Sequence, residues 1–414
     1  MNAAAPIPIN TPGPARLMSL DVFRGATIAG MILVNNPGTW SAAYKPLLHA
    51  EWHGWTFTDL IFPFFLWIVG VAIPLSTARR LEQGQGRRGL LLHALRRCAI
   101  IFALGFFLNS FNYLLDGSLS RDGFAAWLQN YATTVRVPGV LQRIGICYFI
   151  AVVIFLGFSI RGQLAWIAGL LGGYWLLMIV GPMLGCGTGG LEQHGNFCEY
   201  VDSLVLNGKV IGMHVWRGGK TWDPEGVFST VPAVATCLFG VMTGHMLRSK
   251  QTPETRTAWL FVAGNLLLFA GGVMDFWLPI NKKIWTSSYA VFMAGMATNC
   301  FAVCYWLVDV QGWRKWAKPF AIYGMNAITV FMLAGLLGRI LPAIKVAGDS
   351  GKKIGLQSWL YDHLCAPFTS PDTAPFLRSL ASPNNASLMW ALIYVIGLYL
   401  VAYAMYRRKW FLRF

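Results

Sequence analysis

The chain has 414 residues, of which 56% are hydrophobic and only 12% are charged, and its formal net charge is +16. Soluble domains carry roughly a quarter charged residues, so this composition excludes an ordinary soluble protein and indicates a polytopic membrane protein. The basic residues lie in short clusters between apolar segments, where the positive-inside rule predicts them. We therefore interpret the charge as a marker of topology and expect no nucleic-acid partner.

Residues 1–15 are rich in alanine and proline and lack the basic and apolar regions of a signal peptide. We expect a disordered tail there, followed by a single transmembrane domain over 16–414. Apolar segments long enough to cross a hydrocarbon core of about 30 Å then follow one another along the chain. They are 18–36, 57–78, 93–114, 138–160, 164–184, 229–247, 257–278, 285–308, 318–341 and 386–406. The sequence predicts an all-α bundle of about ten transmembrane helices.

The connections between these spans give the orientation. The connection after the second span is rich in arginine, whereas the first connection, 37–56, contains a single lysine. With the arginine-rich connection in the cytoplasm, both termini are cytoplasmic as well. Two long loops, 185–228 and 342–385, then face the outer side, and long ordered loops usually carry function. In the first of them, Cys186 and Cys198 either pair in an oxidising compartment or remain free thiols.

The stretch HAEWHGWTFTDLIFPFFLWIVG at 49–70 is the centre of the functional prediction. In it, a polar loop containing His49 leads into an apolar helix whose first turn holds Asp59. An ionisable side chain entering hydrocarbon costs a few kcal/mol, so it marks a functional site with a partner nearby. A carboxylate that holds one ring nitrogen of His49 leaves the other free to accept a proton, as in a general base. The alternative is that Asp59 only caps the helix.

Several other polar side chains approach the bundle from the same outer side. Asn35 or Asn36 could donate amide N–H groups to an oxyanion, and Asp223 and Glu225 could receive a cationic amino sugar. For each of them, an anchoring role at the membrane surface is the alternative. The further candidates for substrate contacts on this side are Arg143, Asn281 and Lys282.

On the predicted inner side, arginines suit a phosphate-bearing cofactor because their forked N–H groups match phosphate oxygens. Arg24 and Arg97 are the candidates, with a helix-face pair between Asp21 and Arg24 and a purely topological role as the alternatives. Asn326 lies about a third of the way into the ninth span and needs a partner for its amide. It either lines a route between the two faces or holds two helices together. The eight cysteines show no metal-ligand spacing, so no metal is expected.

Seven motifs occur in a fixed order along the chain: SLDVFRG at 19–25, ILVNNPG at 32–38, HAEWHGWTFTDLIFPFFLWIVG at 49–70, GVLQRIG at 139–145, DPEGVFSTVPA at 223–233, PINKKIW at 279–285 and YGMNAI at 323–328. Together they resemble the transmembrane heparan-α-glucosaminide N-acetyltransferase family, including its bacterial members linked to the use of N-acetylglucosamine. The resemblance extends over nearly the whole chain after residue 16.

This resemblance implies an acyltransferase in the inner membrane of a bacterium. It would move an acetyl group from cytoplasmic acetyl-CoA to the amino group of a glucosamine-type sugar on the outer side. The histidine of the family's HAxWxG motif matches His49 and not His53, the asparagine of its VN dipeptide matches Asn35, and the aspartate of TxxDLxFP matches Asp59. His49 would either deprotonate the amine or carry the acetyl group itself.

Two other functions fit the same features. An amino-sugar transporter would also use polar groups near the midplane, and another acyltransferase could act on a lipid or cell-wall sugar. The acceptor stays open, because lysosomal members of the family carry an N-terminal luminal region and a first span that this sequence lacks. Whether the chain works alone or as a homodimer is open too.

Overall fold

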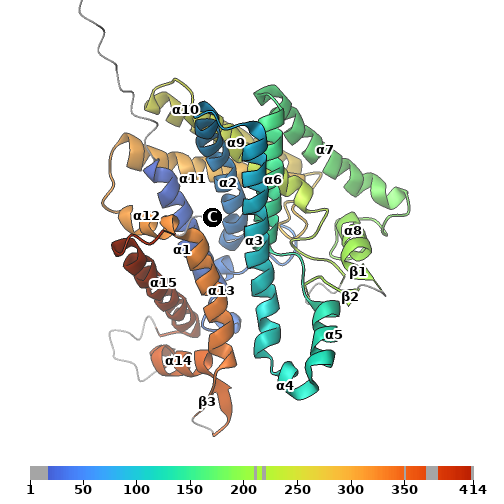
Figure 1. The fold of residues 1–414 in the computed structure, drawn as a ribbon, viewed down its shortest axis with the longest axis vertical. Coiled ribbons are helices and arrows are strands. Elements are labelled where there is room, and N and C mark those ends of the chain that lie inside the picture. The colour runs from blue at the N-terminus through green and yellow to red at the C-terminus, as the bar shows by residue number, and fades with distance from the viewer. Residues whose placement is uncertain (1–16, 209–211, 217–220, 349–350, 370–380, 412–414) are drawn as a thin grey trace, which may run out of the picture.

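The computed structural model describes residues 17–208, 212–216, 221–348, 351–369 and 381–411 (Figure 1). The predicted tail, 1–15, lies outside the described residues. The elements in chain order are α1 (Met18–Asn35), η1 (Trp40–Ala42), η2 (Lys45–Leu47), α2 (Phe57–Glu82), α3 (Arg87–Leu115), α4 (Ser118–Asp122), α5 (Phe124–Thr134), α6 (Val140–Gly157), α7 (Ile160–Met183), α8 (Phe197–Leu206), β1 (Asn207–Gly208), β2 (Gly212–Met213), α9 (Thr230–Leu247), α10 (Pro253–Asp275), α11 (Ser287–Tyr305), η3 (Trp306–Val310), α12 (Lys318–Met325), α13 (Ala327–Ala343), β3 (Lys345–Ala347), β4 (Lys353–Gly355), α14 (Leu356–Leu364), η4 (Ala366–Thr369) and α15 (Pro383–Arg407).

All ten predicted spans are helical, which confirms the all-α polytopic bundle. Eight helices of the described chain are long and apolar enough to cross a membrane, and α12 with α13, bent by 80° at the break between them, is a ninth if the pair counts as one span. The remaining predicted span is α1, which is less apolar because Asp21 and Arg24 lie in its first two turns and Asn35 ends it. The segment 318–341, predicted as one span, is the bent pair α12 and α13.

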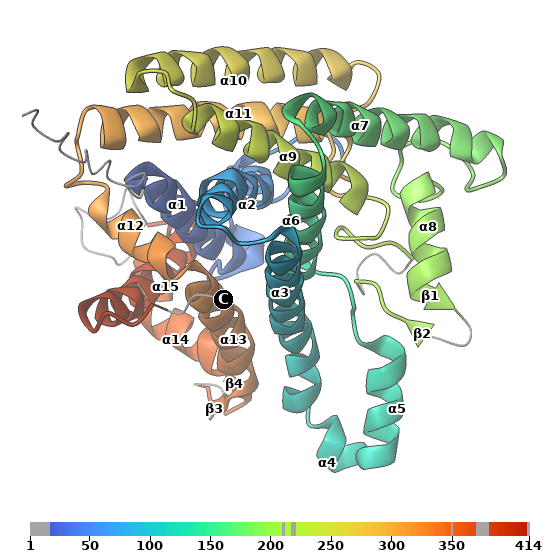
Figure 2. The ribbon, with the colours of Figure 1, turned by 45° about the horizontal axis from the view of Figure 1, so that its top comes forward.

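The helices pack in two groups that meet along α1 (Figure 2). The first group has its core between α2, α3, α6, α7, α9 and α11, with α10 packed on α11. The second has its core between α1, α12, α13 and α15. The two groups meet where α1 contacts α2 and α11, and where α13 contacts α3. We call this region of contact between the two groups the seam, and it positions the candidate site.

The connections that the sequence predicted to face the outer side carry structure of their own (Figure 1). They include α8 with the β1–β2 hairpin, and the β3–β4 hairpin with α14. They also include two short helices that the sequence did not predict, α4 and α5, between the third and fourth spans. These connections form a structured layer on the helix ends, which we call the outer layer after the side on which the sequence predicts it.

Glycines allow α2 and α9 to cross at backbone contact. A Cβ atom at Gly70 would lie 1.9 Å from the carbonyl oxygen of Cys237, and one at Gly240 would lie 2.0 Å from that of Trp67. Small residues at such crossings let transmembrane helices approach closely, so that dispersion contacts and burial hold them together. This crossing supports α2, the helix that carries Asp59.

We expect Gly240→Ala to destabilise the protein by about 1–3 kcal/mol, because the new methyl group must push two backbones apart. Thermal unfolding in detergent, followed by loss of the monodisperse peak, measures the effect. Gly169→Ala in α7 is the matched control, since a Cβ atom there meets nothing within 4 Å. An unchanged unfolding temperature for Gly240→Ala would contradict the close crossing.

Candidate active site

The loop between α1 and α2 is hydrogen-bonded to three other segments of the chain. The Gly54 N–H donates to the carbonyl of Ile280 over 2.7 Å, and the Trp52 indole donates to the carbonyl of Leu191 over 2.7 Å. Near the start of the loop, the Thr39 N–H donates to the hydroxyl of Ser387 over 3.1 Å. His49 therefore extends from a loop of defined conformation.

His49 and Asp59 form a hydrogen-bonded pair, with His49 Nδ1 2.6 Å from Asp59 Oδ1. The second carboxylate oxygen, Oδ2, accepts from the backbone N–H groups of Ala50 and Thr56, each over 3.0 Å. Thr56 and Asp59 also complete a capping box at the start of α2. Capping and histidine binding, which the sequence left as alternatives, are thus both present and use different oxygens.

The pair has the arrangement of a general base. Asp59 is 1% exposed, whereas the His49 side chain is 45% exposed. An ionised carboxylate can only accept hydrogen bonds, so the proton of a neutral His49 lies on Nδ1. Its Nε2 then carries a lone pair that can take a proton or attack a carbonyl carbon.

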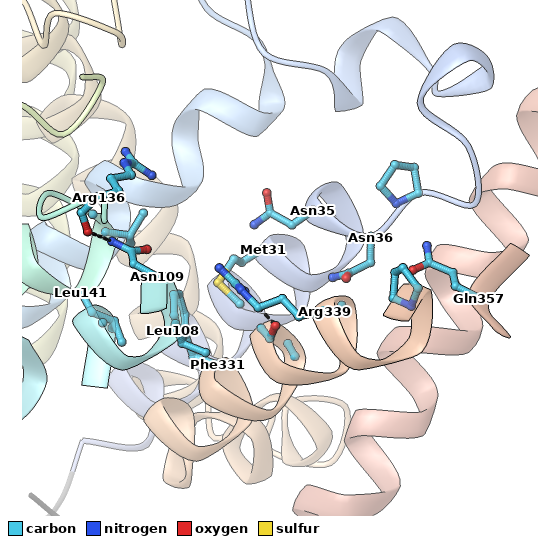
Figure 3. Close-up of a pocket in the computed structure, with 18 of the residues that line it drawn as sticks. Met31, Asn35, Asn36, Leu108, Asn109, Arg136, Leu141, Phe331, Arg339 and Gln357 are labelled. Atoms are coloured by element: carbon cyan, nitrogen blue, oxygen red, sulfur yellow. Dashed lines mark hydrogen bonds between the residues drawn. The ribbon is translucent and has the colours of Figure 1, made fainter. Parts of the chain in front are cut away.

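A cavity of about 610 Å³ lies in the seam between the two helix groups (Figure 3). This volume is within the usual range for small-molecule sites. Asn35 and Asn36 reach it from the end of α1, whereas Asn109 and Arg136 line its opposite side. Pro37 and Trp40, from the loop that carries His49, line it as well, but His49 itself does not. The cavity and the His49–Asp59 pair are thus linked through this loop.

Arg339 of α13 has open hydrogen-bond donors in this cavity. Its Nη1 donates to the carbonyl of Gly335 over 2.8 Å, and its buried Nε has no partner among the residues that the structure describes. Arg339 was not predicted from the sequence, although it is an ionisable residue near the end of an apolar span and the reasoning used for Asp59, near the start of one, applies to it. Arg136 was not predicted either, because it lies in a connection and gives no such signal.

Asp223 and Glu225, predicted to receive a cationic substrate, are held by a cation of the protein itself. Arg136 donates to both oxygens of Asp223, over 2.6 and 2.7 Å, and to Glu225 over 2.5 Å. Lys282 lies 3.9 Å from Glu225. Burial raises the pKa of Glu225, but Lys282 and Arg136 outweigh it and lower the pKa to about 2. Glu225 is therefore ionised at neutral pH.

Arg143 and Asn281 are buried and form hydrogen bonds with the segments that lead into α9 and α11. Arg143 Nη2 donates to the carbonyl of Gly226 over 3.0 Å and to the hydroxyl of Ser229 over 2.5 Å, so it contacts the turn before α9 and forms no hydrogen bond with Asp59. Asn281 Oδ1 accepts from the Lys283 N–H over 2.8 Å. Lys282, which follows Asn281 in the chain, faces Glu225.

The three residues predicted to hold a cofactor are each engaged with other parts of the protein. Arg24 pairs with Asp21 and donates from Nε to the carbonyl of Gly324 over 2.8 Å. The Arg97 guanidinium lies 4.9 Å from the ring centroid of Tyr148, and its buried Nε, like that of Arg339, has no hydrogen-bond partner among the described residues. Asn326 donates to the carbonyl of Trp410 over 3.1 Å at the break between α12 and α13. None of the three lines the cavity in the seam.

Cys186 and Cys198, left open as a pair or as two thiols, are both free in the structure. Cys198 is buried, with its sulfur 3.4 Å from the hydroxyl of Tyr174 and 3.8 Å from the sulfur of Met178. It packs α8 against α7. The outer layer is held here by packing and hydrogen bonds.

Asp202 of α8 gives the outer layer a pH dependence. Burial raises its pKa from about 3.8 to about 7, although its carboxylate accepts from the N–H groups of Asp223 and Val227 over 3.0 and 2.8 Å. The folded protein binds this proton more tightly than the unfolded chain does. Protonated Asp202 therefore adds to the free energy of unfolding, and this contribution is complete below about pH 4 and is lost as the pH rises through 7.

We therefore expect Asp202→Asn to flatten the fall in unfolding temperature between pH 5 and pH 7.5. A tenfold change in proton affinity between the folded and unfolded protein corresponds to about 1.4 kcal/mol, so the difference amounts to a few kcal/mol at most. Thermal unfolding of both proteins across this pH range measures it. Parallel curves for wild type and variant would show that Asp202 does not titrate in the window.

Two proteins of known name are similar to the chain. The heparan-alpha-glucosaminide N-acetyltransferase of Homo sapiens is 31% identical over 365 residues, which cover 77% of this chain and 52% of that protein. The Mus musculus protein of the same name is 29% identical over 373 residues, which cover 79% of this chain and 54% of that protein. The chain thus spans about half the length of these relatives. No protein-family model matches it.

Proposed function

Since the chain belongs to the same family as the heparan-alpha-glucosaminide N-acetyltransferases, we propose that it is a transmembrane N-acetyltransferase of the inner membrane of a bacterium. It transfers an acetyl group from acetyl-CoA to the amino group of a glucosamine-type sugar on the outer side. The observation that carries the proposal is the His49–Asp59 pair, with a buried carboxylate on Nδ1 and an exposed imidazole. The proposed reaction uses no metal.

His49 acts in one of two ways. As a general base, its Nε2 takes the proton of the sugar amine while the nitrogen attacks the thioester carbonyl, and the proton passes to the departing CoA thiolate. As an acyl carrier, Nε2 attacks the thioester first and CoA leaves as the thiolate, which leaves an acetyl-imidazolium. The amine then attacks the acetyl carbon, His49 leaves as the neutral imidazole, and the proton that the amine loses passes to the thiolate. In both routes Asp59 stabilises the positive charge that develops on the ring.

Labelled acetyl-CoA separates the two routes. Incubated with the protein and no acceptor, it leaves label on His49 only if His49 carries the acetyl group. A double displacement would also give ping-pong kinetics. The acceptor class is tested separately with a small panel of amino sugars headed by glucosamine. Failure of purified protein to acetylate any of them would reject the proposal.

Arg339 and the Asn35 amide support the cavity in the seam as the place where the donor binds. The acetyl group then reaches His49 past Pro37 and Trp40, because these residues of its loop line the cavity and His49 does not. Within the described residues, the Asn35 side chain forms no hydrogen bond with the protein, so its amide can donate to the carbonyl oxygen of the thioester. The open donors of Arg339 match the phosphate oxygens of CoA. Residues at the inner side, Arg24, Arg97 and Asn326, are the alternative place for those phosphates.

We expect Arg339→Gln to weaken acetyl-CoA binding by about tenfold, the loss of one charge-assisted hydrogen bond. Binding is measured by isothermal titration with CoA, which avoids any effect on the chemical step. Arg97→Gln is the matched comparison because Arg97 lies outside the cavity. A loss confined to Arg97→Gln would place the phosphates at the inner side instead.

One feature favours an amino-sugar transporter as the second candidate. The ninth span is broken at Asn326 and bends by 80°, and broken spans line substrate sites in many transporters. A transporter binds the sugar without CoA. Thermal stabilisation by CoA but not by glucosamine alone supports the transferase, whereas uptake of glucosamine into vesicles without CoA supports the transporter.

A further inference from the structure

A second cavity, of about 340 Å³, lies between α3, α6, α7 and α9. Figure 2 shows α6 at the meeting point of these helices. Apart from the turn 225–227 and the 137–139 connection, its lining is mostly apolar and comes from predicted spans. These apolar lining residues include Phe102, Ile146, Ile150, Leu170, Val231 and Val234. Ile150 lines the cavity and is 36% exposed, so the lining reaches the surface of the bundle at this residue.

This cavity also holds a buried cation with open donors. Arg143 lines the cavity and is 1% exposed, and its Nε and Nη1 have no hydrogen-bond partner in the described part of the chain. Leaving a buried guanidinium partly unpaired is costly, since each unsatisfied charged donor loses its solvation. The carboxylate of Glu225, which also lines the cavity, is already held by Arg136 and Lys282. Among the described residues Arg143 forms no ion pair with Glu225, but its charge helps to lower the pKa of Glu225, and its guanidinium carbon lies 5.2 Å from the ring centroid of Trp285. These contacts leave Nε and Nη1 without a hydrogen-bond partner.

The depth of Arg143 suits a lipid head group. It lies in the first turn of α6, which begins at Val140 on the outer side, where phosphates of the outer leaflet are expected. From Arg143 to Ile150 is seven residues, or about 10 Å along the helix at 1.5 Å per residue. An alkyl chain anchored at Arg143 therefore reaches the surface of the bundle at Ile150 within the apolar lining.

We propose that this cavity binds a membrane phospholipid, with phosphate oxygens at Nε and Nη1 of Arg143 and one acyl chain between α6, α7 and α9. The site adjoins the cavity in the seam, because Gly139 and Gln142 line both. Gln142 is packed between them, with its amide nitrogen donating to the carbonyl of Val137 over 3.1 Å. The proposal rests on the transmembrane fold and not on the acetyl-transfer reaction.

Photo-crosslinking tests the acyl chain. The full chain is reconstituted in vesicles of phosphatidylglycerol that carry a diazirine in one acyl chain, irradiated and mapped by peptide mass spectrometry. Label is expected on the cavity side of α6 and α9, and Ile146→Trp should reduce it at least fivefold by filling the cavity. Val153→Trp is the matched control, since Val153 lies on the same helix, is 41% exposed and does not line the cavity. Equal labelling of the two variants would overturn the proposal.

Native mass spectrometry tests the head group. Wild-type protein should retain phosphatidylglycerol over diacylglycerol, which lacks the phosphate, and Arg143→Gln should lose at least fivefold of this preference. Equal retention of both lipids by the wild type would mean that an alkyl chain alone occupies the cavity, and retention of neither would mean that only water does. Both results overturn the phosphate contact. If Arg143→Gln does not fold, the wild-type comparison and the Ile146→Trp and Val153→Trp pair still decide.

Discussion

Replacing His49 with Ala is expected to reduce acetyl transfer by at least about 100-fold, the smallest usual contribution of a positioned base. Both routes fail without the ring, because neither a proton acceptor nor a nucleophile remains at this position. Acetyl-CoA binding should be nearly unchanged, since His49 does not line the cavity that holds Arg339. Initial rates with labelled acetyl-CoA, together with isothermal titration of CoA, measure the two effects separately.

His53→Ala is the matched control for His49→Ala. His53 lies four residues further along the same loop, and its Nδ1 is 3.4 Å from the amide nitrogen of Asn281 and has no carboxylate partner in the described chain. The His53→Ala variant should retain most of the activity. Near-normal turnover of the His49 variant, or equal losses in both, would remove His49 from the mechanism.

The His49–Asp59 pair could be predicted because both partners are local. They are ten residues apart, and the sequence places one at the end of a polar loop and the other in the first turn of an apolar helix. An ionisable residue at such a place needs a partner, and the loop offers few. Which carboxylate oxygen binds His49 and which caps the helix could not be predicted, because this depends on the path of residues 50–56.

The cavity could not be predicted from the sequence, because it is formed by segments far apart in the chain. Asn35, Arg136 and Arg339 meet only through the packing of α1, α13 and the connection between α5 and α6, which Asn109 of α3 holds by a hydrogen bond to the carbonyl of Arg136. The pairing of Arg136 with Asp223 joins residues 87 positions apart. Hydropathy gives the spans but not their neighbours, so the acidic residues were expected to face a substrate when they in fact face Arg136.

The break in the ninth span was missed for a related reason. The segment 318–341 is uniformly apolar apart from its ends and Asn326, and it lacks an internal proline near the break. The bend follows from packing: a Cβ atom at Gly324 would lie 2.0 Å from the carbonyl oxygen of Asp21, so α12 is pressed against α1. Asn326 then leaves the helix and binds Trp410. Hydropathy alone does not distinguish a bent span from a straight one.

Replacing Asp59 with Asn is expected to reduce acetyl transfer by about 100-fold or more while the unfolding temperature changes little. The amide oxygen can take the place of Oδ2 and still accept from the N–H groups of Ala50 and Thr56, so the cap of α2 remains. The amide nitrogen then faces His49 Nδ1 and donates to it. Nδ1 becomes the acceptor, the ring proton moves to Nε2, and the nitrogen that should take a proton or attack carries one instead.

Initial rates and thermal unfolding together distinguish this role from a structural one. Asp59→Ala is the matched comparison: it removes the cap as well, and should lower the unfolding temperature where Asp59→Asn does not. If the Asn and Ala variants lose expression and activity equally, Asp59 serves the helix and not the histidine. The carboxylate sets the tautomer that leaves Nε2 free. A normal rate in the Asn variant would therefore mean that His49 works without its carboxylate.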